Sequence, residues 1–392
     1  MEFQHFETQA VRTRIAQTPE KEHASPLFLT SSFTFDSAEE GAAIFQGQQS
    51  ANLYSRFSNP NTDEFIRKLC LMEEVTDGVA TASGMAAVFT SFAALLSSGD
   101  HVIACKSIFG NSSYILSNIL IKWGIDVTYV DIENKEAWKN AVQPNSKMLF
   151  VESPANPTLK IADLAFLGQL CKENNLIFSV DNCFATPYLQ KPSQFGADLI
   201  IHSATKYIDG QGRVLGGAIL GSKELISPCY DFIRRTGASL SPFNAWVLSK
   251  SLETLAVRMD RHCSNALQLA RYLEVHDEIK SVSYPFLKNN PQAALAQSQM
   301  TAGGGLVGCE LKGDDNRGAA FLNALKMHSL TANLGDTRSI ATQPASTTHS
   351  KLSSDEQLAA GISPHYLRFS VGLEHIDDII KDIEQALNLT SR

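Results

Sequence analysis

Short apolar runs alternate with segments of helix length between about residue 61 and residue 255. These runs are GVATAS, HVIAC, DVTYVD, KMLFVES, LIFSVDN, DLIIHSATK and GGAILG. Short β-rich runs separated by helices are typical of a mostly parallel sheet with helices on both faces. We therefore expect an α/β fold for residues 61–255.

The segments on either side of this region have different patterns. Residues 1–60 are polar and aromatic with weak periodicity, and SPLFLTSSFTF and NLYSRFSNPN resemble extended segments and turns, so we expect an arm there. After a long helical stretch at 244–275 come the runs SVSYP, GLVGCEL, HSLTANLG and HYLRFSVGLE, and then the helix-like DDIIKDIEQALNL. Residues 256–392 are therefore predicted to form a smaller α+β domain.

Charge and composition indicate which kinds of molecule the protein binds. The chain carries 33 Lys and Arg against 41 Asp and Glu, a formal charge of −8, which disfavours a nucleic-acid or anionic-lipid surface and favours small molecules. The 7 cysteines are dispersed without a CxxC pair, and no apolar window has the length of a membrane span, so we expect a cytoplasmic protein with reduced thiols. We predict no metal, because His202, His349 and His365 lack ligand-like spacing.

Lys206 lies in LIIHSATKY, where an apolar run ends at a polar loop. This places it just past the expected carboxyl end of a strand, where open parallel sheets bind ligands. An isolated lysine is usually a solvated surface charge. Ser203 and Thr205 lie within three residues of it, and both hydroxyls can bond phosphate while the lysine forms a Schiff base with a cofactor aldehyde. The alternative is a polar strand end.

Two further segments support a cofactor site. Asp181 closes LIFSVDN, where a carboxylate could keep a pyridine nitrogen protonated, although a helix N-cap is the alternative. The turn Ser83-Gly84-Met85 precedes a helix expected to begin near Met85, whose N–H groups could hold phosphate. An ordinary strand-to-helix turn is the alternative. Cys183, beside Asp181, is interpreted as a packing residue.

With SGM, VDN and SATK in this order, the chain resembles the fold-type I pyridoxal-phosphate enzymes of cysteine and methionine metabolism. That family includes cystathionine γ-synthase, cystathionine lyases, methionine γ-lyase and homoserine-ester sulfhydrylases. The resemblance covers almost the whole chain, from YSRFSNPN through ESPANP and SATKY to GDTRS, QPASTTH and LRFSVGLE. It implies pyridoxal 5′-phosphate as the cofactor.

The resemblance also implies roles for individual residues around the cofactor. Lys206 looks like the Schiff-base lysine and proton shuttle, and Asp181 like the partner of the pyridine nitrogen. The residues that look like phosphate ligands are Gly84, Met85, Ser203 and Thr205, with Ser83 in the same turn. Tyr54 and Arg56 of the arm would reach a neighbouring subunit's phosphate, and the family suggests a homotetramer built as a pair of dimers.

Further residues look like contacts of the cofactor ring and the substrate. Asn156 resembles the residue that bonds the cofactor's phenolic oxygen, and Arg368 resembles the clamp for the substrate α-carboxylate, with Ser339 as a secondary contact. A surface ion pair is the alternative for Arg368. Phe109 stands where many relatives carry a tyrosine, so stacking on the ring survives while the hydroxyl is lost.

Departures from the family pattern bear on the reaction. Position 111 is Asn, whereas methionine γ-lyases carry a cysteine there, and Arg338 in LGDTRS suits a succinyl carboxylate unless it is a structural ion pair. FETQAVRTR, NLGDTRS and SIFGNSSYILSNILIKWGI look most like O-succinylhomoserine sulfhydrylases. We expect γ-replacement on O-succinylhomoserine with sulfide, giving homocysteine and succinate in methionine biosynthesis. The alternatives are an O-acetylhomoserine sulfhydrylase, a cystathionine γ-synthase, a γ-lyase, or a non-catalytic pyridoxal-phosphate-binding regulatory protein.

Overall fold

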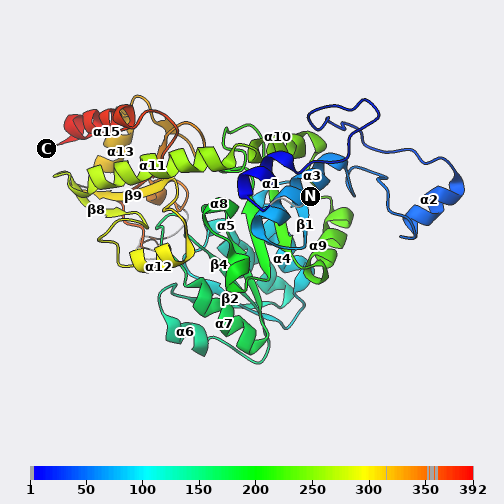
Figure 1. The fold of residues 1–392 in the computed structure, drawn as a ribbon. Coiled ribbons are helices and arrows are strands. Elements are labelled where there is room, and N and C mark those ends of the chain that lie inside the picture. The colour runs from blue at the N-terminus through cyan, green and yellow to red at the C-terminus, as the bar shows by residue number, and fades with distance from the viewer. Residues whose placement is uncertain (1–3, 315, 351–352, 354–356, 358–360, 392) are drawn as a thin grey trace.

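The computed structural model describes residues 4–314, 316–350, 353, 357 and 361–391 (Figure 1). A seven-stranded sheet has the order β1-β7-β6-β5-β4-β2-β3. Its strands are β1 (Asp77–Thr81), β2 (His101–Cys105), β3 (Asp126–Val130), β4 (Ser146–Glu152), β5 (Ile177–Asp181), β6 (Leu199–Ser203) and β7 (Gly217–Gly221). β7 runs antiparallel to both of its neighbours, β1 and β6, and the pairs formed by β6, β5, β4, β2 and β3 are all parallel, which confirms the mostly parallel α/β sheet.

Helices cover both faces of this sheet. The α-helices that the described residues form are α1 (Phe6–Arg12), α2 (Ala38–Phe45), α3 (Pro60–Glu73), α4 (Gly84–Leu95), α5 (Gly110–Tyr114), α6 (Lys135–Asn140), α7 (Leu164–Asn174), α8 (Thr186–Leu189), α9 (Lys223–Thr236), α10 (Pro242–Leu252), α11 (Leu255–Glu274), α12 (Ala293–Gln299), α13 (Arg317–Ala324) and α15 (Ile376–Thr390). One core packs α4, α7 and α9 against the sheet, and the other packs α3, α10 and the start of α11. Ile201 and Ile200 of β6 belong to opposite cores, as strand alternation requires.

The C-terminal region contains a second sheet with the order β10-β11-β12-β9-β8. Its strands are β8 (Ile279–Ser283), β9 (Leu306–Leu311), β10 (Ser329–Leu330), β11 (Ile340–Thr342) and β12 (Tyr366–Ser370). The long helix α11 joins the two regions (Figure 1), since Met259 packs in a core of the first sheet and Leu269 in the core of the second. The limits of the three predicted domains remain predictions.

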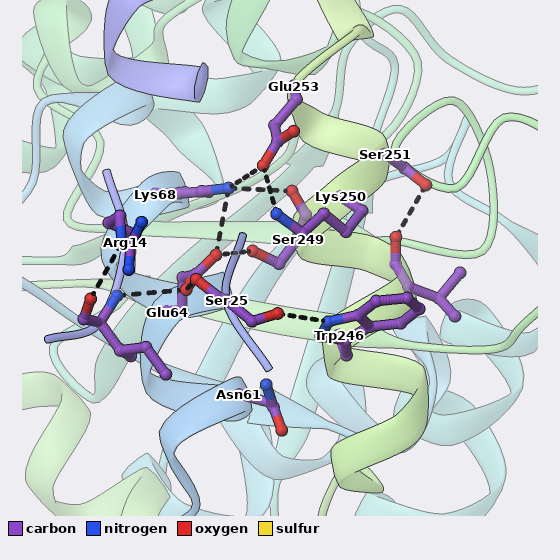
Figure 2. Close-up of polar contacts among 12 residues, drawn as sticks. Arg14, Ser25, Asn61, Glu64, Lys68, Trp246, Ser249, Lys250, Ser251 and Glu253 are labelled. Atoms are coloured by element: carbon purple, nitrogen blue, oxygen red, sulfur yellow. Dashed lines mark hydrogen bonds and ion pairs between the residues drawn. The ribbon is translucent and has the colours of Figure 1, made fainter. Parts of the chain in front are cut away.

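The N-terminal segment is anchored at one place and extended at another. Figure 1 shows α2 on a loop that projects from the rest of the molecule. Nearer the start of the chain, the buried carboxylate of Glu64 on α3 binds the Ile15 N–H at 3.2 Å and the Ser25 hydroxyl (Figure 2). The same carboxylate pairs with buried Lys68 at 3.3 Å and accepts from the Ser249 hydroxyl of α10 at 2.8 Å. This cluster ties the segment before the projecting loop to two helices.

In the described ranges, no helix is both long enough and apolar enough to span a bilayer.

Candidate active site

A cavity of about 400 Å³ opens at the carboxyl ends of β1, β4, β5 and β6. The register places these ends together, because Glu152 of β4 pairs with Asp181 of β5, and Gly217 of β7 pairs with both Ser203 and Thr81. The lining also includes residues from the starts of α4 and α5 and from the second sheet. The site therefore lies where the expected fold brings strand ends together.

The turn Ser83-Gly84-Met85 forms one wall. α4 begins at Gly84, one residue earlier than expected, and the Ser83 hydroxyl caps the helix by accepting from the Ala86 N–H at 3.1 Å. A Cβ on Gly84 would lie 2.5 Å from the Cβ of Ser203, so only glycine lets the two segments approach this closely. The N-terminus of this twelve-residue helix offers N–H groups and a positive dipole end to an anion.

Lys206 reaches the cavity from the turn after β6. Its Nζ donates to the Asn333 Oδ1 at 2.9 Å, which comes from the loop after β10. Burial lowers the pKa of the Lys206 amine, and the nearby charge of Arg368 lowers it further. Thr205 also lines the cavity, and its hydroxyl bonds the backbone of Gly216 at 3.2–3.3 Å. The amine is thus more available as a base or nucleophile than a surface lysine.

Two carboxyl groups lie side by side at the ends of β4 and β5. Burial raises the pKa of Asp181 to about 6, although the N–H of Cys183, at 3.0 Å, and the charge of His202 lower it. Burial and the neighbouring Asp181 both raise the pKa of Glu152. Two neighbouring carboxyl groups do not both ionise easily, so a cation bound beside Asp181 would be stabilised there.

Glu152 is a site residue that the sequence reasoning did not single out. Its carboxylate accepts the N–H of Phe109 at 2.8 Å and the N–H of Asn156 at 2.9 Å. One side chain therefore holds the two segments that carry Phe109 and Asn156 into the cavity. The sequence feature that could have identified Glu152 is its position at the start of ESPANP, as the last residue of an apolar strand.

Arg368 enters the cavity from β12 of the second sheet. Its guanidinium is almost fully buried and donates to the Asn156 Oδ1 at 2.8 Å and the Thr342 hydroxyl at 3.3 Å. The Nε of Arg368 is buried and has no hydrogen-bond partner among the residues that the structure describes. A buried, incompletely satisfied guanidinium is a site for a carboxylate.

Cys183 also lines the cavity. Burial raises the pKa of its thiol well above the usual range, and the charge of Asp181 raises it further. A thiol in this environment stays protonated and is a poor nucleophile.

The arm residues lie elsewhere on this chain. Tyr54 is 42% exposed, and Arg56 stacks over its ring at 5.4 Å while contacting the backbone oxygen of Arg234. Arg56 lines a different cavity of about 560 Å³, between α3, α9 and the arm, whose lining does not include Lys206. The predicted role of Tyr54 and Arg56 in another subunit's site stays a prediction.

Ser339 and Arg338 also lie outside the residues that line the Lys206 cavity. The Ser339 hydroxyl donates to Glu374 at 2.9 Å and accepts from the Gly372 N–H at 2.9 Å. Arg338 is largely exposed and bonds both carboxylate oxygens of Asp336, at 2.8 and 2.9 Å. Their substrate contacts remain predictions.

Within the described part of the chain, His, Cys, Asp and Glu form no group of three or more that could hold a metal ion. The chemistry that the cavity offers comes instead from one amine, two carboxyls, one guanidinium and an anion-binding helix end.

Comparison with known proteins finds similarity over nearly the whole length of the chain. Residues 7–388 match the family model described as Cys/Met metabolism PLP-dependent enzyme. The chain is 42% identical to an O-succinylhomoserine sulfhydrylase of Pseudomonas aeruginosa over 97% of this chain and 95% of that protein. It is also 42% identical to an L-methionine gamma-lyase of Fusobacterium nucleatum subsp. polymorphum over 93% of each.

A solved structure from Campylobacter jejuni, described as an O-acetylhomoserine (thiol)-lyase with N′-pyridoxyl-lysine-5′-monophosphate, aligns with a TM-score of 0.94. The two chains are 34% identical, and the alignment covers 98% of this chain and 99% of the other.

Proposed function

Because the chain belongs to the family of Cys/Met metabolism PLP-dependent enzymes, with pyridoxal 5′-phosphate as cofactor, we propose that it catalyses γ-replacement on O-succinylhomoserine. Sulfide is the proposed nucleophile, and homocysteine and succinate are the proposed products. The sulfhydrylase of Pseudomonas aeruginosa, similar over nearly the whole length of both chains, supports this choice.

The residues of the cavity fit the cofactor. Gly84 lets the start of α4 approach Ser203 closely, which brings helix N–H groups and the Ser203 hydroxyl together. The half-buried Asp181, at the end of β5, suits the ring nitrogen. We assign the phosphate to Ser83, Gly84, Met85, Ser203 and Thr205, and the phenolic oxygen to Asn156. Phe109 would lie against the ring.

When bound, the cofactor supplies an electron sink for negative charge that develops on the substrate carbon. Lys206 would hold the cofactor and move protons at the substrate Cα and Cβ, and its burial favours the neutral amine that these transfers require. Arg368 would orient the substrate by binding its α-carboxylate, using the guanidinium that the protein leaves incompletely paired.

The observation that carries the choice of leaving group is Phe109. Its backbone N–H is fixed by Glu152 and its side chain lines the cavity, yet it has no hydroxyl that could donate a proton. Succinate departs as a stable carboxylate and needs no acid, whereas a thiolate leaving from methionine benefits from protonation. This favours an acyl ester over a thioether as substrate.

Methionine γ-elimination is the second candidate, because the gamma-lyase of Fusobacterium nucleatum is as similar in identity as the sulfhydrylase. The two reactions share the early proton transfers and differ in the leaving group and the nucleophile.

The test is product identification by mass spectrometry. The holo-protein would be mixed with O-succinylhomoserine, O-acetylhomoserine or methionine, each with sulfide, with cysteine and alone. We expect homocysteine and succinate mainly from the succinyl ester with sulfide. Cystathionine as the product would indicate a γ-synthase. Formation of 2-oxobutyrate and methanethiol from methionine would indicate a γ-lyase, and the absence of turnover would indicate a non-catalytic protein.

A further inference from the structure

Three neighbouring strands end in pairs of consecutive polar residues that face different surroundings. The members that line the cofactor cavity are Glu152, Asp181 and Ser203. Their chain neighbours are Ser153, Asn182 and His202, which do not line the cavity and are fully buried. Because side chains alternate along strands, this second row is placed to fix the strand ends from behind.

Glu73, the last residue of α3, joins members of this second row. Its Oε1 lies 2.6 Å from the Nε2 of His202 and accepts from the Nδ2 of Asn182 at 2.9 Å. Gln190 continues the network, because its Nε2 donates to the Asn182 Oδ1 at 3.0 Å and to the Ser153 carbonyl at 2.9 Å. A continuous buried network thus connects the end of α3 with the ends of β4, β5 and β6.

The carboxyl group of Glu73 needs hydrogen-bond partners that compensate for its burial. It is fully buried at the carboxyl end of a helix, where the dipole disfavours negative charge. Within the described part of the chain, its Oε2 and the Nδ1 of His202 have no hydrogen-bond partner. His202, at 2.6 Å, is placed to supply the compensation.

His202 also lies beside Asp181. Asp181 pairs with Ile201 in the sheet register, and the Asn182 N–H donates to the Ile201 carbonyl at 3.0 Å. The titratable groups that interact with Asp181 are Glu152 on β4, Cys183 in the following turn and His202 on β6. A positive charge on His202 lowers the pKa of Asp181, which opposes the effect of burial.

We propose that Glu73 and His202 form a positioning pair behind the cofactor pocket, which fixes the ends of β5 and β6 and keeps Asp181 ionised toward the cofactor ring nitrogen. The proposal rests on the role assigned to Asp181 and not on the identity of the substrate. Neither residue touches the cofactor cavity, so both act through Asp181 and Ser203.

The test replaces Glu73 by Gln, which removes the charge and keeps an acceptor for Asn182. Two properties of the holo-protein are measured without substrate: the Kd for pyridoxal phosphate and the pH midpoint of the cofactor's absorption change. We expect the Kd to rise about tenfold. At metal sites, losing a residue that supports a ligand weakens affinity by about 10- to 100-fold, and we take the lower value. The midpoint should move upward, because a ring nitrogen with less positive charge withdraws less electron density from the chromophore.

Asp181→Asn removes the carboxylate itself, so it gives the midpoint shift against which the other variants are compared. His202→Gln is the second test variant, because the glutamine amide can still donate to Glu73. The matched control is Asp382→Asn. It alters another buried carboxyl–imidazole pair, 2.8 Å from His328, outside the cavity. The control should lose thermal stability and keep both cofactor properties.

The proposal is overturned if Glu73→Gln and His202→Gln keep the wild-type Kd and midpoint, as the control does. Should Glu73→Gln fail to fold, His202→Gln alone decides between these outcomes. An unshifted Asp181→Asn would instead reject the role of Asp181. A failed substrate assignment affects neither readout, because no substrate is present.

Discussion

At the scale of single residues, Phe109 offers a direct test of the leaving-group argument. Phe109→Tyr adds a hydroxyl at a position that already lines the cavity. We expect elimination from methionine to rise at least about tenfold, because a positioned acid can protonate the departing thiolate. Turnover of O-succinylhomoserine should change little, as measured by release of 2-oxobutyrate and succinate. Phe109→Leu is the control for altered ring contact, and an equal rise there would contradict the argument.

Arg338 is the residue for testing acyl preference. To bind the succinyl carboxylate, the Arg338 guanidinium must either keep its hydrogen bonds to Asp336 or break them. We expect Arg338→Ala to raise KM for O-succinylhomoserine about tenfold, as loss of a charged hydrogen bond predicts. KM for O-acetylhomoserine, which lacks the carboxylate, should stay the same. Equal KM changes for both esters would leave Arg338 as a structural partner of Asp336.

The raised pKa of Asp181 predicts that the stability of the cofactor-free protein depends on pH. Its pKa of about 6 lies above the ordinary value of 3.8, so between about pH 4 and pH 6 the folded state retains a proton that the unfolded state has released. Stability therefore falls as pH rises through this window. Asp181→Asn should weaken this fall and raise the free energy of unfolding at pH 7 by on the order of 3 kcal/mol. Urea unfolding of the cofactor-free proteins at several pH values measures this, and parallel curves would contradict it.

At the scale of elements, the start of α4 depends on one glycine. Gly84→Ala would place a Cβ 2.5 Å from that of Ser203 and 2.9 Å from its Cα. Such overpacking costs about 1–3 kcal/mol. Where this cost falls on the conformation that binds the phosphate, the Kd for pyridoxal phosphate should rise by about five- to 150-fold. Gly110→Ala is the control, since Gly110 begins α5 with nothing within 4 Å of an added Cβ. Equal Kd values for the two variants would contradict the prediction.

The strands of the main sheet could be predicted because each is a short buried run that stands apart from the helices. HVIAC, for instance, coincides with β2, all of whose residues are buried. β11 was missed, because three residues give too little pattern to recognise. Contacts between distant elements were also missed: Glu73 and His202 are 129 positions apart, and no local pattern links a helix end to a strand.

The site was predictable to the extent that its residues lie at strand ends. Lys206, Asp181 and the turn at Gly84 follow apolar runs and do line one cavity. Glu152 was overlooked because a strand-end carboxylate alone does not reveal that it holds two neighbouring backbone N–H groups. Side-chain pairings such as Arg338 with Asp336 depend on loop conformation, which the sequence pattern does not specify.

At the scale of the whole molecule, the arm predicts dependence on a second subunit. Arg56 lies outside the lining of the cavity that its own chain builds around Lys206. If arms are exchanged, Arg56→Ala and Lys206→Ala damage different sites of a mixed dimer. We expect unfolding and refolding the two variants together to recover activity that neither has alone, measured as homocysteine formation. A mixture no more active than its components would contradict arm exchange.

The pairing of Asn156 with Arg368 has a consequence for biosynthesis. These two residues are separated by 212 positions, and Arg368 lies on the final strand of the second sheet. The ribosome therefore delivers Gly84, Asp181 and Lys206 long before it delivers Arg368. Because domains tend to fold as they emerge, a nascent chain can assemble its cofactor-binding strand ends before it has the side chain proposed to hold the substrate. Translation thus delivers the residues proposed to bind the cofactor before the side chain proposed to bind the substrate α-carboxylate.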